Sequence, residues 1–170
     1  SSALAADAMQ SLPRDHVVRP FAQMLTGWMQ ALGGQADVGI QNLNQSLLLA
    51  HSEGLVGTEV EAQALLATVL LSRRDIPAAD TLVRDALQNW EGRGLTHFLA
   101  SGALLSGPAA FLAARAGDRE AAASRLRQAQ EAALTFGTVF PWLHVISHAF
   151  SAAAHATLGD RAQAGHHLET

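Results

Sequence analysis

Apolar side chains recur along this chain at intervals of three and four residues, which is the spacing of one face of an α-helix. A clear example begins after Gly117 and Asp118. The apolar positions that follow are Ala122, Leu126, Ala129, Ala133 and Phe136. Glycine suits the left-handed position that closes a helix, and aspartate suits the N-cap of the next one. The pattern therefore predicts a helical hairpin, two antiparallel helices joined by a short turn.

The same arrangement recurs at intervals of about 39 to 44 residues. A leucine lies nine residues after each expected turn residue: Gly34 and Leu43, Arg73 and Leu82, Gly117 and Leu126, Gly159 and Leu168. A small side chain, which would let helix backbones approach closely, lies five residues after each turn residue: Gly39, Ala78, Ala122 and Ala164. Leu4 fits the leucine series without a turn of its own. A repeat of this length with helix–turn–helix content is typical of an α-solenoid.

The hairpins can be placed along the chain by their Pro and Gly residues. A lone helix is expected over residues 2–11, and the hairpins begin near Pro20, Gly57, residue 95 and Pro141. Because Pro108 falls in mid-pattern, we expect a kink or two short helices near Ser106. The expected inner face of the first hairpin's first helix is Phe21, Leu25, Trp28, Met29 and Leu32. In the helix from Pro141 it is Trp142, Val145, Ile146, Ala149 and Ala153.

These elements predict an all-α fold, a right-handed α-solenoid of tetratricopeptide-like hairpins with about nine helices. Residues 1–170 are expected to form a single repeat domain. The chain starts Ser-Ser without Met and stops inside an expected helix, so we expect it to be a fragment of a longer protein.

Composition removes several classes of function. The net charge is −4 with no basic run, so no contact with nucleic acid is expected. The absence of cysteine excludes disulfides, thiolate metal sites and a thiol nucleophile. No apolar stretch reaches the ~18 residues of a membrane span, and we expect a cytoplasmic protein.

One segment resembles a known family. It reads GWMQALGGQADVGIQNLNQSLLLAHSEG over residues 27–54, with a Gly-Trp pair, a Gly turn, Gly39-Ile40 and Leu43. This is similar to the tetratricopeptide-like repeats of bacterial multidomain signalling ATPases, which include large LuxR-type transcription regulators and ATPase-linked nucleotide cyclases and kinases. The Leu158-Gly159-Asp160 turn is also typical of them. The period exceeds 34 residues and Tyr is absent, which departs from standard tetratricopeptide repeats. There is no phosphate loop, so any activity that the resemblance implies would belong to a parent protein.

Three histidines carry the chemically suggestive pattern. His144, His148 and His155 lie at i, i+4 and i+11 on one side of the helix from Pro141, and we expect them to face solvent or a groove. His144 and His148 could share a metal ion, but the helix offers no third ligand and no Glu to act as a base. Without a nearby acid, their pKa values should lie at or below about 6.5.

The leading functional hypothesis is a non-catalytic module, without cofactor or metal, that acts as the sensor or interaction region of a bacterial signalling or transcription regulator. It would bind a protein segment, another domain of the parent chain or a small-molecule effector on the concave surface of the repeats. The candidate groove residues are Gln23, Gln30, Glu61, His97, Ser101, His144 and His148. The alternatives are a small helical metal-binding protein or enzyme centred on His144 and His148, and a plain assembly scaffold. Weak self-association is expected through the two ends.

Overall fold

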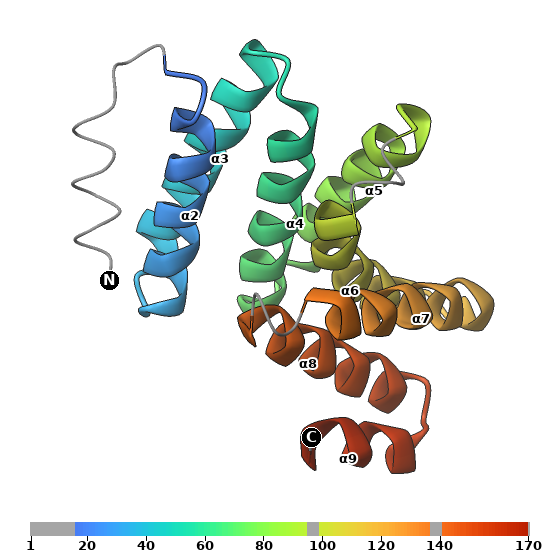
Figure 1. Cartoon of the computed structure of the whole chain (residues 1–170). Coiled ribbons are helices and arrows are strands. Elements are labelled where there is room, and N and C mark those ends of the chain that lie inside the picture. Colours follow the sequence, from blue (N-terminus) through green and yellow to red (C-terminus); the bar gives the residue numbers. More distant parts are fainter. Residues whose placement is uncertain (1–15, 95–98, 137–140, 170) are drawn as a thin grey trace. The chain divides into compact units, whose positions relative to one another are not determined.

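The computed structural model describes residues 16–94, 99–136 and 141–169, and all regular secondary structure in these ranges is helical (Figure 1). The eight helices are α2 (Arg19–Leu32), α3 (Ala36–Ser52), α4 (Val56–Ser72), α5 (Ile76–Gly92), α6 (Leu99–Arg115), α7 (Arg119–Phe136), α8 (Pro141–Thr157) and α9 (Arg161–Glu169). The predicted all-α class is confirmed. The lone helix expected over residues 2–11 lies outside the described residues.

The chain divides into two compact units, Ser1–Arg93 and Gly94–Thr170. In the first unit α2 packs on α3 and α4 on α5, while α3 and α4 are also neighbours. In the second unit α6 packs on α7 and α8 on α9, and α8 also contacts α6 and α7. Helices that follow each other in sequence therefore pack in pairs, as the hairpin pattern predicts. None of the helices in the described part of the chain is long and apolar enough to cross a membrane.

Left-handed residues mark the ends of successive helices in the first unit. They are Gly34 (φ 84°), Gly54 (φ 69°), Arg74 (φ 64°) and Gly94 (φ 66°), at a regular spacing of 20 residues. The sequence predicts the turn residue at Arg73, but the left-handed residue is Arg74, one position later. Arg73 has ordinary helix-end angles, and its guanidinium pairs with the carboxylate of Asp37. Arg74 takes a conformation that favours glycine.

This one-residue shift moves the core positions of α5. Counting from Arg74, the small residue is Ala79 and the inner apolar residue is Val83, and both are buried. The expected Ala78 and Leu82 are only half-buried. At the other three turns the predicted small residues Gly39, Ala122 and Ala164 are buried, and so are the leucines Leu43 and Leu126. Leu168, near the end of α9, is 75% exposed.

An aspartate follows each of three left-handed residues, Arg74, Gly117 and Gly159, and caps the next helix, as predicted for Asp118. The carboxylate of Asp118 accepts from the backbone N–H of Ala121 at 2.9 Å. Asp75 and Asp160 accept from the corresponding backbone N–H groups at 3.3 and 3.2 Å. Each cap satisfies one of the N–H groups that a helix start leaves without a partner. The left-handed residue ends one helix, and the aspartate next to it starts the following one.

Two glycines bring α2 and α3 into close contact. A Cβ atom on Gly27 would lie 2.9 Å from the carbonyl oxygen of Gly39, and one on Gly39 would lie 2.7 Å from that of Gly27. Neither site has room for a side chain. The expected role of Gly39, close approach of helix backbones, is confirmed, and Gly27 serves the same contact.

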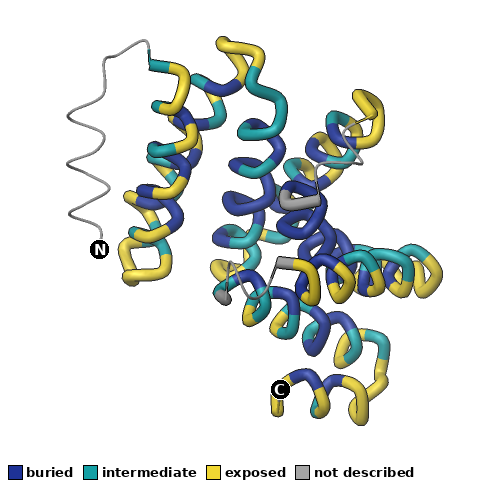
Figure 2. Tube along the Cα trace, viewed as in Figure 1, coloured by how far each residue is buried: buried dark blue, intermediate teal, exposed yellow. Residues whose placement is uncertain are grey.

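This contact explains why the predicted inner face of α2 is wrong. The side of α2 that carries Gly27 packs on α3, and Met24, Thr26 and Trp28 are buried with it. The other predicted residues form a partly exposed apolar stripe, Phe21 (41%), Leu25 (37%), Met29 (44%) and Leu32 (58%). Figure 2 shows the contrast between α2, with its exposed side, and α4, which is buried along most of its length.

Pro108 does not divide its helix. α6 is a single helix over Leu99–Arg115 with Pro108 inside it, so the expected pair of short helices is wrong. Proline removes one backbone hydrogen bond from the helix interior. The surrounding residues 101–110 are all buried, and Gly107 packs against the ring of Phe150 in α8. Burial along this stretch offsets the lost bond.

Candidate functional sites

Four amide side chains form a continuous hydrogen-bonded chain between α2 and α3. The amide nitrogen of Gln23 donates to Gln45 Oε1 at 2.9 Å and to Asn42 Oδ1, and Asn42 Nδ2 donates to Gln30 Oε1. We call these four residues the amide ladder. Gln23 is buried at its centre, so this polar group is satisfied by neighbours. The ladder fixes the orientation of its two ends, Gln45 and Gln30.

A groove of about 460 Å³ opens beside the ladder and is lined by Arg19, Gln23, Gln45, Leu48 and Leu49. Leu48 is 71% exposed, so its side chain forms an apolar wall open to solvent. The lining thus combines a guanidinium group, amides and apolar carbon. Such a lining suits a ligand with hydrogen-bond acceptors next to an apolar side chain.

The predicted groove residues lie in different surroundings. Gln23 and Gln30 are joined through Asn42 in the amide ladder. Glu61 on α4 is half-buried, and Ser101 on α6 is buried, so Ser101 lies on no open surface. His97 lies outside the described residues. His144 and His148 lie together on α8.

The sequence interpretation missed the residues that α3 contributes to this site. Asn42 and Gln45 are three residues apart on the second helix of the hairpin, and Leu48 follows after three more. This polar–polar–apolar spacing on one helix face was the available signal. The described candidate groove residues from the sequence all lie on α2, α4, α6 and α8, so none of them belongs to α3.

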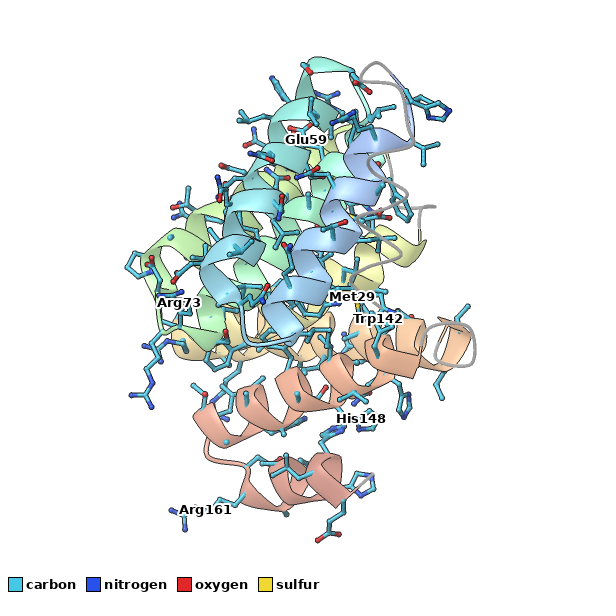
Figure 3. The ribbon with its side chains drawn as sticks, turned by 90° about the vertical axis from the view of Figure 1, so that its left-hand side faces the viewer. Met29, Glu59, Arg73, Trp142, His148 and Arg161 are labelled. Atoms are coloured by element: carbon cyan, nitrogen blue, oxygen red, sulfur yellow. The ribbon has the colours of Figure 1, made fainter. Side chains whose placement is uncertain are left out.

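A second cluster of polar groups lies between α8 and α9. We call it the histidine cluster: His144, His148, His155, His166 and His167. His167 is buried, and its ring centroid lies 5.2 Å from that of His148, 5.5 Å from that of His155 and 5.7 Å from that of His166. The ring centroids of His144 and His148 are 4.4 Å apart. Figure 3 shows His148 on the side of α8 that faces α9.

The contacts of these rings fit one arrangement of their protons. The amide nitrogen of Gln130, on α7, donates to Nε2 of His167 at 3.4 Å. A neutral imidazole that accepts at Nε2 carries its proton on Nδ1. His167 Nδ1 then donates to Nδ1 of His148, 3.2 Å away. Both contacts can form together when the imidazoles of His148 and His167 are neutral.

Burial favours that neutral state. It is the main cause that lowers the pKa of His148, and the charges of His144 and His166 lower it further. The pKa of His167 is lowered by burial first and then by His148, His155 and His166. The lowered pKa expected for His148 is thus confirmed, with burial a larger cause than the expected repulsion.

His144, His148 and His155, which we expect to face solvent or a groove, are all half-buried, and the rings of His148 and His155 lie against His167 of α9. The expected inner face of α8 is wrong, since Val145 is 67% exposed and Ala149 is also exposed. The buried residues of α8 are instead Leu143 and the small residues Ser147, Ser151, Ala152 and Ala154. The hydroxyl of Ser147 donates to the backbone carbonyl of Ala129 at 3.1 Å, which allows a polar side chain at this close helix contact.

Side chains in the described residues include no group of three or more His, Cys, Asp or Glu that is placed to hold a metal ion. The structure nevertheless adds His167 to the His144–His148 pair, and the sequence alone had placed no third histidine beside it.

The chain matches none of the family models, curated proteins or solved structures with which it was compared.

Proposed function

We propose that this chain is a non-catalytic helical-repeat module that binds an extended, acidic segment of a protein in the groove beside the amide ladder. The observation that carries this proposal is the ladder itself, which orients amide groups along a groove with an apolar wall. The ladder orders the hairpin and also brings Gln23 and Gln45 to the groove, which favours recognition there.

The direction of the hydrogen bonds determines what the groove offers. Gln45 and Gln30 each accept a bond through the carbonyl oxygen of the side chain. Their NH₂ groups are therefore not used within the ladder and can donate to a ligand. Of these two residues Gln45 lines the groove, and together with the guanidinium of Arg19 it supplies donors there. Backbone carbonyls and a carboxylate of a bound segment would complement these donors, while Leu48 and Leu49 would contact an apolar side chain.

The wider role rests on the resemblance alone. We infer that the module serves as the sensor or interaction region of a bacterial signalling or transcription regulator. The acidic segment would belong to another domain of the parent chain or to a separate protein.

The test measures binding of fluorescent peptides with acidic, neutral and basic residues around a leucine, by polarisation. Acidic peptides should bind, and Leu48→Ser and Gln45→Ala should each weaken binding about tenfold or more, since an interface contact that matters costs over ~1.4 kcal/mol. Val145→Ser is the matched control, because Val145 is similarly exposed but lies in the other unit. Equal binding of basic peptides, or binding unchanged in both groove variants, would refute the proposal.

An assembly scaffold is the second candidate function, and the apolar stripe on α2 favours it. Its four residues, Phe21, Leu25, Met29 and Leu32, lie on one exposed helix face. In that case Met29→Ser should abolish self-association in sedimentation experiments and leave peptide binding unchanged.

A further inference from the structure

We propose that three residues of the histidine cluster bind one zinc-like transition-metal ion, with His148 and His167 as a preformed pair of ligands and His144 as the third, while His166 takes no part. This site lies in the second unit and does not depend on the peptide-binding proposal.

The pair of Nδ1 atoms already has the separation that a metal ion needs. Zinc binds imidazole nitrogen at about 2.0–2.1 Å with tetrahedral angles, which places two ligand nitrogens roughly 3.3–3.4 Å apart. His148 Nδ1 and His167 Nδ1 are 3.2 Å apart. An ion would take the place of the proton that the two nitrogens now share. Neither helix would have to move.

His144 can supply the third nitrogen by turning its side chain. It lies one helical turn before His148, a spacing at which two histidines of a helix can reach one ion. Their ring centroids are 4.4 Å apart, and His144 is only half-buried, so its ring has room to rotate. This rotation is the step that separates the present arrangement from a complete three-histidine site.

The surroundings of the pair also suit a metal ligand. Gln130 holds the far nitrogen of His167, as partners in the outer shell of metal sites orient ligating imidazoles. Once Nδ1 binds an ion, Nε2 carries the proton, and the exposed Gln130 amide turns over so that its carbonyl oxygen accepts from Nε2. Burial keeps both rings neutral near pH 7, so no proton has to be displaced from a charged imidazole.

The donor set determines the class of ion. Imidazole nitrogens suit zinc, copper, nickel and iron, whereas calcium and magnesium require oxygen ligands. The nearest carboxylate contact described in the cluster joins Asp160 to His155, at 3.8 Å. A bound ion would tie α8 to α9 and stabilise the end of the chain.

The experiment titrates Zn²⁺ alone into the chelator-treated full chain by calorimetry and repeats the titration with Co²⁺ by visible absorption. We expect one ion per chain and the strong absorption bands of tetrahedral cobalt. His148→Gln and His144→Gln should each weaken zinc binding about tenfold or more. His167→Gln should do the same, and circular dichroism would establish that this buried variant folds.

Two control variants separate this site from adhesion of metal to surface histidines. His51 lies in the first unit, and His166 is exposed on α9, so His51→Gln and His166→Gln should leave zinc affinity unchanged. The proposal is overturned if no stoichiometric binding occurs. It is equally overturned if His166→Gln abolishes binding while His144→Gln and His148→Gln leave it intact.

Discussion

Replacing Arg74 by glycine should stabilise the first unit, because Arg74 holds a left-handed backbone conformation. Its φ is 64°, and the residues at the equivalent turns, Gly34, Gly54 and Gly94, are all glycine. A side chain in this conformation costs about 1–2 kcal/mol. Glycine removes that cost but gives the unfolded chain more freedom, which takes back roughly 0.4–1 kcal/mol. The expected net gain in unfolding free energy is about 0.5–1 kcal/mol.

Urea unfolding followed by tryptophan fluorescence measures this change, since Trp28 and Trp90 are buried in the first unit. Arg74→Ala is the decisive control, because it removes the same charge but keeps a Cβ atom. It should change stability little. Gly34→Ala should destabilise by about 1 kcal/mol or more, and open space around Gly34 means that only backbone strain would act. If Arg74→Ala stabilised as much as Arg74→Gly, the left-handed conformation would not be the cause.

Three further outcomes test the packing and the electrostatics. Leu126→Ala should lower the unfolding free energy by about 2–5 kcal/mol in denaturant melts, because Leu126 is buried, whereas Leu48→Ala should stay within roughly 0.5 kcal/mol. Gly39→Ala should destabilise by about 1–3 kcal/mol, since its Cβ would overlap the backbone of α2, and a melt equal to that of the unchanged chain would contradict this contact. The pKa values of His148 and His167 are lowered in the folded state, so the unfolded chain binds more protons as the pH falls below about 6.5. The stability that comes from keeping these two imidazoles neutral should be complete above pH 6.5 and be lost as the pH falls through their folded-state pKa values. Thermal melts from pH 8 to 5 should show the decline. NMR titration should show both pKa values below 6.5.

The helices and their pairing could be predicted from the sequence because local chemistry sets them. The Gly117-Asp118 and Gly159-Asp160 turns were read correctly, since a left-handed residue followed by a cap acts within one turn of chain. The same reasoning failed at Arg74, where the left-handed residue is not a glycine. Sequence alone gives no reason to choose Arg74 over Arg73, and the error moved the core of α5 by one residue.

Which face of a helix turns inward was harder to predict. On α2 the longer apolar stripe is the exposed one, because a glycine contact sets the side that packs on α3. On α8 two serines, Ser147 and Ser151, are buried beside Leu143, while Val145 is exposed. In both helices small side chains determine the packing by permitting close approach. A count of large apolar residues does not detect them.

Both candidate sites lie mainly between the two helices of one hairpin, and in each the second helix contributes residues that the sequence does not predict. Asn42 and Gln45 of α3 join Gln23 and Gln30 of α2 in the amide ladder. His167 of α9 lies against His148 of α8. A short turn with a left-handed residue fixes how the two helices of a hairpin pair. With the contact from Gln130 of α7 included, the geometry of each site is therefore set within its own unit and does not depend on how the two units are arranged. It follows that the peptide-binding and zinc-binding experiments can give independent answers on the same chain.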